Sequence, residues 1–345
     1  MKKKIKITVS CVCILLLTAL LLGFLQELVQ PKYMTVSREG ALIGEYYDET
    51  TDHDVLFIGD CEVYEGFTPP TLWEEYGITS YVRGSAQQLA WHSYYLLEET
   101  LARETPKVVV FNVLALKYGE PQDEAYNRLT LDGMKLSASK IRAINVSMTE
   151  EESFASYLFP LLRFHSRWKE LGAEDWEYLF RRDRVSHNGY LMQTEVRPGI
   201  SSITPQPLAD YTLPATSMEY LEKMRALCQE NGVELILIKA PTNDWKYHWY
   251  DEWDAQIVDY AAEHSLSYYN FIPMIDEIGI DWSCDTYDVG VHLNVYGAEK
   301  LTSFFGEILV REHGLTSHKD DAALSAVWEG KLAAYYAERN ADFAE

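Results

Sequence analysis

Short apolar segments alternate with helical patterns along most of this chain, and this alternation limits the folds available to it. Five apolar runs bounded by turn or polar residues are typical of strands buried in a parallel sheet: 54–60, 78–84, 107–113, 233–241 and 266–271. Helical patterns separate them at 90–104, 217–232 and 253–264. The sequence therefore predicts an α/β fold on a doubly wound parallel sheet with right-handed crossovers. Ligands bind such sheets at the carboxyl ends of the strands.

The alternation breaks between residues 114 and 213, where helical stretches precede a Pro/Ser-rich loop. We interpret this region as a partly helical insertion after the third strand that forms a cap over the carboxyl edge of the sheet. A helix from Gly297 and an amphipathic helix over 320–340 complete the chain.

The amino-terminal segment has the pattern of a membrane anchor. The lysine-rich start "MKKKIK" precedes a run without charge from Ile7 to Leu25, which is about long enough to cross a ~30 Å hydrocarbon layer. Lysines before such a run favour a cytoplasmic amino terminus. Because no convincing cleavage site follows, we expect residues 1–30 to form an uncleaved transmembrane anchor and residues 31–345 to form an extracytoplasmic domain attached to the membrane.

Charge and motif content exclude several classes of function. The formal net charge of −23 repels phosphate backbones, so nucleic acid is not an expected partner. The sequence has neither metal-ligand spacing in the outer domain nor a Gly-rich phosphate loop, so we expect neither a metal nor another cofactor. Oligomeric state does not follow from the sequence.

The five cysteines divide into two groups. Cys11 and Cys13 lie in the anchor, whereas Cys61, Cys228 and Cys284 belong to the outer domain, an odd number for a disulfide framework. The pattern around Cys228 is typical of a small core residue, although a Cys228–Cys284 bridge is also allowed. Cys61 stands apart because it follows the first predicted strand.

Cys61 in "FIGDCEVYEG" has the setting of a nucleophile. Gly59 permits a tight turn before Asp60, and a thiol at a helix start is expected to have a lowered pKa. The Cys61 N–H could stabilise an oxyanion formed during attack on a carbonyl. Further donors are predicted at the ends of the second and third strands, from the Gly84 N–H and the Asn112 side chain.

A base for this nucleophile is predicted in "DTYDVGVHLNVYGAEK", just before the helix that starts near Gly297. His292 is the candidate base, and a carboxylate from Asp288 or Asp285 would orient its imidazole. The sequence does not choose between the two carboxylates.

Three basic residues are weaker candidates for substrate contact. Lys239 ends the fourth strand on the same sheet edge and is either solvated or a contact for an anionic substrate. His165 and Arg167 in "RFHSRW" are either structural and surface residues or part of a cap that recognises phosphate or carboxylate.

These residues resemble the SGNH (GDSL-like) hydrolase family. "FIGDCEVYEG" is similar to its first block, Gly84 and Asn112 match the second-block glycine and third-block asparagine, and "DVGVHLNVYGAEK" is similar to the block with the catalytic histidine. The resemblance covers 54–113 and 233–310 and implies a flavodoxin-like three-layer sandwich. The anchor and insertion look like those of envelope-acting members, among them teichoic-acid D-alanylation and polysaccharide O-acetylation proteins.

The chain departs from the family pattern at three positions. Cys61 replaces the nucleophilic serine, Asp288 lies four residues before His292 instead of three, and Asn112 stands in "FNVLA". The resemblance implies an esterase or acyltransferase that acts on an acylated glycan or a teichoic-acid-like polymer. The alternative is a non-catalytic binding or assembly protein of the cell envelope with a degenerate site.

Overall fold

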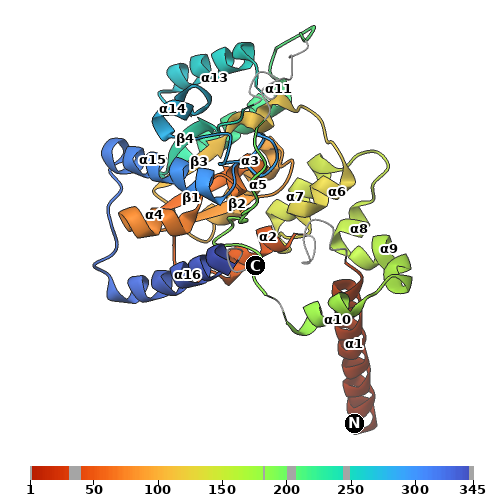
Figure 1. Ribbon diagram of the computed structural model, residues 1–345. Coiled ribbons are helices and arrows are strands. Elements are labelled where there is room, and N and C mark those ends of the chain that lie inside the picture. The colour runs from red at the N-terminus through yellow and green to blue at the C-terminus, as the bar shows by residue number, and fades with distance from the viewer. Residues whose placement is uncertain (1, 31–39, 182, 200–206, 244–248, 342–345) are drawn as a thin grey trace. The chain divides into compact units, whose positions relative to one another are not determined.

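The computed structural model describes residues 2–30, 40–181, 183–199, 207–243 and 249–341 (Figure 1). The chain divides into two compact units. One comprises Gly40–Thr149 and Val185–Glu345, and the other comprises Met1–Glu39 and Glu150–Arg184. We call them the sheet unit and the anchor unit.

The sheet unit contains five parallel strands in the order β2-β1-β3-β4-β5. Their bounds are β1 Val55–Gly59, β2 Ser80–Gly84, β3 Val108–Asn112, β4 Glu234–Lys239 and β5 Ser267–Asn270. The strand order reverses between β1 and β3. In open α/β sheets this switch point is where a crevice forms at the carboxyl ends of the strands.

Alternate side chains of the strands enter two different cores. Val55 and Phe57 of β1 pack in one cluster with Leu72 and with Phe305. The intervening Leu56 is also completely buried, and side chains alternate between the two faces of a sheet. Burial on both faces explains why these strands are continuous apolar runs.

Helices cover both faces of the sheet (Figure 1). Helices α4 and α15 contribute to the cluster around Phe57, whereas α5 contacts β1 and α11 contacts β4. The helices of eight or more residues in this unit are α4 Pro69–Tyr76, α5 Ala90–Leu101, α6 Glu124–Leu131, α7 Ala138–Ser147, α11 Ala215–Glu230, α13 Asp251–His264, α15 Val295–His313 and α16 Ala322–Ala341. The shorter ones are α2 Ala41–Gly44, η1 Glu45–Asp48, α3 Cys61–Tyr64, η2 Val113–Lys117, η4 Ile272–Met274 and α14 Ile275–Ile278.

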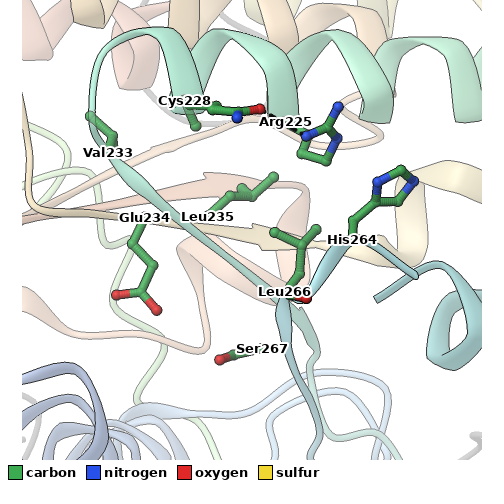
Figure 2. A pocket seen from close by; sticks show the side chains of 10 residues that line it. Arg225, Cys228, Val233, Glu234, Leu235, His264, Leu266 and Ser267 are labelled. Atoms are coloured by element: carbon green, nitrogen blue, oxygen red, sulfur yellow. Dashed lines mark hydrogen bonds between the residues drawn. The ribbon is translucent and has the colours of Figure 1, made fainter. Parts of the chain in front are cut away.

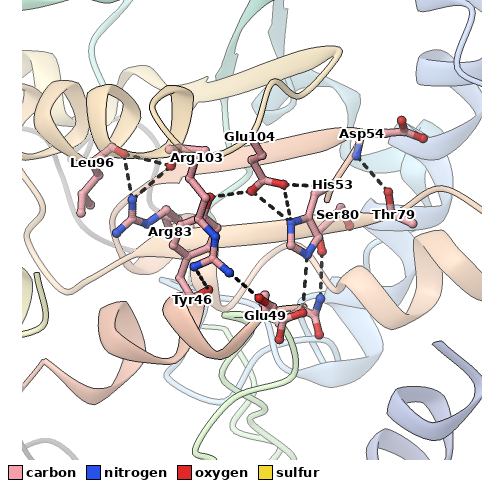
Figure 3. Close-up of polar contacts among 12 residues, drawn as sticks. Tyr46, Glu49, His53, Asp54, Thr79, Ser80, Arg83, Leu96, Arg103 and Glu104 are labelled. Carbon is pink, nitrogen blue, oxygen red and sulfur yellow. Dashed lines mark hydrogen bonds and ion pairs between the residues drawn. The ribbon is translucent and has the colours of Figure 1, made fainter. Parts of the chain in front are cut away.

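A buried charged cluster lies beside the start of β1 (Figure 3). The His53 ring lies 3.1 Å from a carboxylate oxygen of Glu104 and 3.6 Å from one of Glu49. Lys331 of α16 also pairs with Glu49. Burial opposes ionisation of Glu49, but His53 and Lys331 outweigh it and lower the pKa of this carboxyl to about 2. The cluster thus links the last helix to the segment that precedes the sheet.

Apolar packing holds the same helix in place. The rings of Trp328 and Trp73 stack with centroids 5.4 Å apart, and Trp328 is fully buried. The amphipathic pattern at the end of the sequence therefore belongs to a helix packed on α4.

The anchor unit consists of one long helix and several short ones. They are α1 Lys2–Val29, α8 Phe154–Leu158, α9 Pro160–Phe164, η3 His165–Lys169 and α10 Ala173–Phe180. The segment Lys4–Val29 is long and apolar enough to cross a membrane.

The predicted α/β fold with a parallel sheet is confirmed, and each predicted strand lies within a residue or two of the observed one. The region 114–213, expected to be a single cap, is divided between the two units. Helices α6 and α7 pack beside α2 and α5. The stretch that reaches the carboxyl edge is extended, and its Leu191 N–H donates to the Tyr64 carbonyl at 2.8 Å.

We predict that replacing Glu49 with glutamine destabilises the sheet unit in a pH-dependent way. A carboxyl whose pKa is about 2 when folded and 4.5 when unfolded adds stability above pH 4.5, and this contribution is lost as the pH falls toward 2. Glu49→Gln should reduce the free energy of unfolding by on the order of 2 kcal/mol at pH 7 and by much less at pH 3.

Chemical denaturation at the two pH values measures this difference. The exposed neighbour Asp48 supplies the control Asp48→Asn. Equal losses for Glu49→Gln at pH 7 and pH 3 would contradict the prediction.

Candidate active site

Cys61 lies at the carboxyl end of β1, where the chain turns into α3. Asp60 is the N-cap of this helix, and its side chain accepts a hydrogen bond from the Glu62 N–H at 3.2 Å. Cys61 is therefore the first helical residue, and its own N–H has no acceptor within the helix. Its side chain is partly exposed. The turn presents both the sulfur and a backbone donor at the switch point of the sheet.

His292 is held in a loop directly before α15. The side chain of Asn294, the N-cap of α15, accepts from the Tyr296 and Gly297 N–H groups. Its amide group donates to the Cys284 and Glu195 carbonyls at 2.8 and 3.1 Å. Asn294 thus fixes the start of the helix and the loop that carries His292.

The Asp288–His292 loop contains a residue in a strained conformation. Val289 has a φ of 64° and Gly290 a φ of 104°, and a left-handed conformation for a β-branched residue costs on the order of 1–3 kcal/mol. The Gly290 carbonyl accepts from the Asn243 N–H at 2.8 Å, and a Cβ at Gly290 would lie 2.7 Å from the Asn243 side chain. This turn allows Asp288, four residues before His292, to reach the imidazole.

The sulfur, imidazole and carboxylate form a continuous chain of contacts. Cys61 Sγ lies 3.0 Å from His292 Nε2, and Asp288 Oδ2 lies 2.6 Å from His292 Nδ1. The second oxygen of Asp288 accepts from the His292 backbone N–H at 2.7 Å. Asp288 favours a proton on Nδ1, and in the neutral imidazole Nε2 is then the acceptor for the thiol proton.

Asp285, the other carboxylate considered as the orienting acid, makes different contacts. It is buried, pairs with Lys300 Nζ at 2.5 Å and accepts from the Asp281 N–H at 2.7 Å. Asp285 therefore braces the loop against α15, and Asp288 is the carboxylate that meets His292.

Asn112 is not available as an oxyanion donor in this structure. Its amide group donates to Asp60 Oδ1 at 3.2 Å and to Glu62 Oε2 at 2.9 Å, and its carbonyl oxygen accepts from the Ala240 N–H at 3.3 Å. Both N–H bonds of the amide are thus used within the protein, because Glu62 and Asp60 lie beside the end of β3.

Lys239 is likewise neither solvated nor open to substrate. Its side chain is completely buried, and its ammonium lies 2.7 and 2.9 Å from the two carboxylate oxygens of Glu62. It also donates to the Ala240 carbonyl at 2.7 Å. These three contacts account for the donors of an ammonium group. Glu62, which sequence reasoning missed, is its partner, and its place one residue after Cys61 was the available signal.

Gly84 serves close packing at the end of β2. It lies in register with Gly59 of β1, and a Cβ there would lie 3.0 Å from the Gly59 carbonyl oxygen and 3.2 Å from the Tyr64 side chain. A glycine at this position therefore lets α3 approach the sheet.

Arg167 and His165 belong to the anchor unit, and their recorded contacts lie within it. Arg167 donates to the Val29 and Gln30 carbonyls, both at 2.9 Å, and the His165 ring lies 3.3 Å from the Leu162 carbonyl. Of the two roles that the sequence left open for Arg167, these contacts are those of a structural residue at the end of α1.

A second carboxylate near His292 was also missed. Glu65 Oε2 lies 3.8 Å from His292 Nδ1 and accepts from the Tyr287 hydroxyl at 2.9 Å. Burial raises the pKa of Glu65 to about 7, although the His292 charge opposes the shift. The position of Glu65 four residues after Cys61 was a usable signal, because such residues share a helical face.

The sequence predicts a lowered pKa for the Cys61 thiol, but the structure around Cys61 and His292 gives the opposite shift. Protein atoms desolvate the sulfur and raise the pKa of Cys61, although the His292 charge opposes this. Burial disfavours the imidazolium, yet the Cys61 sulfur and the Asp288 carboxylate raise the pKa of His292 well above its usual value. Because α3 has only four residues, its dipole does not outweigh the burial. The resting sulfur is a thiol at neutral pH.

The remaining outer cysteines are free. Cys228 is buried and Cys284 is exposed, and neither forms the bridge that the sequence allowed. Burial raises the pKa of Cys228 to about 12. Within the described residues, no group of three or more His, Cys, Asp or Glu side chains could hold a metal ion.

A cavity of about 260 Å³ lies elsewhere in the sheet unit (Figure 2). Glu234 at the start of β4 and Ser267 at the start of β5 line it, together with Arg225 and Cys228 of α11 and His264 of α13. The cavity is therefore at the amino ends of the strands, opposite the edge that carries Cys61.

Comparison with known proteins finds likeness only to solved structures. No family model and no curated protein sequence matches the chain. The chain is similar to a candidate acylhydrolase from Bacteroides fragilis, with 14% identity and a TM-score of 0.38 over 78% of this chain and 94% of that one. It is also similar to a GDSL-like lipase from Bacteroides thetaiotaomicron, with 13% identity and a TM-score of 0.37 over 79% of this chain and 95% of that one.

We predict that alkylation of Cys61 by iodoacetamide is slow at pH 6 and accelerates into the alkaline range, because the pKa of the thiol is raised. His292→Ala should slow it further at pH 8, since His292 is the group that lowers this pKa. Peptide mapping by mass spectrometry separates Cys61 from the exposed Cys284. Rapid labelling of Cys61 at pH 6 would contradict the raised pKa.

We also predict that Lys239→Met costs about 3–5 kcal/mol of unfolding free energy, because it leaves the Glu62 carboxylate buried without its partner. The double variant Glu62→Gln/Lys239→Met should recover part of this loss. Denaturant titration measures both.

The exposed pair Lys223–Glu219 on α11 is the matched control, and Lys223→Met should cost less than about 1 kcal/mol. If Lys239→Met proves no more costly than Lys223→Met, the buried pair does not have the role described.

Proposed function

We propose that this protein is an extracytoplasmic acyl esterase or acyltransferase that uses Cys61 as nucleophile and His292 as general base. The observation that carries the proposal is the 3.0 Å contact between Cys61 Sγ and His292 Nε2, with Asp288 on the other ring nitrogen at 2.6 Å. A nucleophile within hydrogen-bond reach of an oriented base is the arrangement that covalent acyl transfer requires.

In the first half of the reaction, the Cys61 thiol attacks the carbonyl carbon of an ester. Its proton passes to His292 Nε2 as the C–S bond forms, and the carbonyl oxygen becomes an oxyanion. The Cys61 N–H at the start of α3 is a donor that can stabilise this charge. The intermediate then breaks its C–O bond, and the leaving alkoxide takes the proton from His292. The product is a thioester on Cys61.

In the second half, an acceptor hydroxyl or water attacks the thioester carbonyl. His292 takes the acceptor's proton, the C–S bond breaks and the sulfur recovers a proton from His292. Water as acceptor gives hydrolysis, and a hydroxyl gives transfer. A thioester is a more reactive acyl donor than an oxygen ester, which favours transfer to a second substrate at least as well as hydrolysis.

The charges around His292 favour the proton transfers of this reaction. Asp288, and Glu65 when it is ionised, stabilise the imidazolium that forms when the thiol proton is transferred. The pKa values of Cys61 and His292 are both raised. When Cys61 is a thiol and His292 is an imidazolium, the site is inactive, because it has no base. The rate should therefore rise with pH as this state loses one proton.

The predicted membrane anchor and the net charge of the protein limit the class of substrate that we propose. The helix α1 is long and apolar enough to anchor the chain in a membrane, and its end is buried against other helices of its unit at Leu28 and Val29, which favours an anchor over a removed signal. We propose an acylated envelope glycan or teichoic-acid-like polymer as substrate. The net charge of −23 favours the neutral glycan over a phosphate-rich polymer.

A non-catalytic envelope binder is the second candidate. The engagement of the Asn112 amide by Asp60 and Glu62 favours it, because a donor that an acyl-transfer site would use is occupied. In that case Cys61 and His292 would line a ligand site without performing chemistry.

We predict that the purified chain releases acetate from an aryl acetate and that Cys61→Ala and His292→Ala each reduce the rate at least about 100-fold, because general-base catalysis contributes ~10²–10⁴-fold. The wild-type rate should rise between pH 6 and pH 9. Release of the aryl alcohol, followed by absorbance, measures the rate.

Cys284→Ala removes another outer cysteine, one that is exposed, and should leave the rate unchanged. Cys61→Ser tests whether the site also activates a hydroxyl. Equal rates in the wild type, Cys61→Ala and His292→Ala would exclude the enzyme and leave the binder.

A further inference from the structure

The short helices of the anchor unit surround a defined level of α1. Phe24 of α1 contacts Trp176 of α10, with ring centroids 6.3 Å apart. Leu28 and Val29 are 3% exposed, whereas Leu20 is 71% exposed. Helices α9 and α10 pack against α1. The protein therefore buries the end of α1 at Leu28 and Val29 and leaves most of the earlier residues exposed.

This level coincides with the end of the apolar run. The uncharged run ends at Leu25, directly after Phe24, and the polar Gln26 and Glu27 follow. When α1 spans a bilayer, the boundary between hydrocarbon and headgroups lies at this transition. In that case its contact with Phe24 places Trp176 at the membrane–water interface.

Polar contacts fasten the short helices to α1. Arg167 donates to the Val29 and Gln30 carbonyls, each at 2.9 Å, which satisfies acceptors at a helix end that lack partners within the helix. Asp175 in turn lies 3.4 Å from the Arg167 guanidinium and accepts from the Gly172 N–H at 3.0 Å. These partly buried contacts hold α10 at the same level as the end of α1.

The outward side chains of this segment are large and apolar. Trp176 and Phe180 stand four residues apart on α10 and so share a face, and they are 46% and 82% exposed. Phe159, Leu162 and Trp168 are exposed by 56%, 60% and 66%. Soluble surfaces rarely gather so many large apolar side chains in one short segment.

We propose that residues 154–180, which contain α8, α9, η3 and α10 and are here called the collar, lie in the outer headgroup region of the bilayer beside the end of α1. In this arrangement the five exposed apolar side chains of the collar insert among the lipids, as aromatic residues do in membrane interfaces. The inference rests on the membrane anchoring included in the proposed function, and it is independent of the chemistry at Cys61.

Apolar contact, more than charge, is expected to drive this binding. Acidic and basic residues are mixed along the collar, for example Lys169 next to Glu170 and Arg167 paired with Asp175. The collar should therefore bind a zwitterionic phosphatidylcholine surface without anionic lipid.

The test uses the full chain reconstituted in phosphatidylcholine vesicles that contain a lipid brominated near the headgroup. Bromine quenches the fluorescence of nearby tryptophans. We expect the quenched fraction of the emission to fall at least twofold in Trp168→Phe/Trp176→Phe. The control Trp253→Phe, on α13 of the sheet unit, should leave the quenched fraction within error of the wild type.

Two further measurements separate the ways in which the inference could fail. Flotation of the vesicles reports whether the chain is anchored, and loss of co-flotation would overturn the anchor and the collar together. Co-flotation with the same quenched fraction in the double variant and the wild type would overturn the collar alone, and would indicate that water or another protein covers these side chains. Aryl acetate hydrolysis in the same samples reports on the Cys61 site separately.

Leu162→Ser/Phe180→Ser provides a second check that keeps all tryptophans. It should increase quenching of the tryptophan emission by acrylamide from the aqueous side, because the collar would leave the lipid. Unchanged acrylamide quenching in this variant would count against insertion of the collar.

Discussion

One buried ammonium group organises the edge of the sheet on which the candidate site stands. Lys239 ends β4, and its bond to Glu62 reaches the turn that follows β1. Asn112 at the end of β3 bonds to the same Glu62 carboxylate. The carboxyl ends of three neighbouring strands are therefore joined by charged and polar contacts away from water, where such contacts are stiff and costly to break. The backbone that carries Cys61 rests on this network.

The network also explains the unusual electrostatics of the sulfur. The protein places several carboxylates, from Asp60, Glu62 and Glu65, within a few residues of Cys61. Of these three, only Glu62 pairs with an ammonium group, that of Lys239. Burial raises the pKa of Asp60 to about 6 and that of Glu65 to about 7. A thiolate would add another negative charge to this group. The thiol therefore keeps its proton at rest, and in the proposed reaction the nucleophilic sulfur forms only when the neutral His292 ring accepts that proton.

The fold and the pairing of Cys61 with His292 could be predicted from the sequence, whereas the choice of Asp288 over Asp285 and the surroundings of the pair could not. Strands buried on both faces leave continuous apolar runs, so β1 to β5 could be located, and Cys61, His292 and Asp288 stand in segments with a recognisable local pattern. The sequence shows that Asn112 and Lys239 end strands, but it does not show whether a polar side chain there meets substrate or another buried group. Here both side chains bond to the Glu62 carboxylate. The direction in which the Glu62 side chain points depends on the turn at Asp60. In the same way, the sequence left the role of Arg167 open, because its carbonyl partners at Val29 and Gln30 are remote in sequence.

The number of residues between the end of α1 and Arg167, which bonds to its last carbonyls, has a consequence for biosynthesis. Arg167 follows Val29 by 138 residues, an interval that takes about 7–28 s to translate at ~5–20 residues per second. In the proposed arrangement, α1 enters the bilayer long before the residues that satisfy its terminal carbonyls leave the ribosome. During that interval water at the membrane surface must hydrate the helix end, and the collar displaces this water only after much of the sheet unit has been synthesised. In that arrangement the lysines and apolar run of α1 alone decide its orientation in the membrane, and the later contacts stabilise an orientation that is already set.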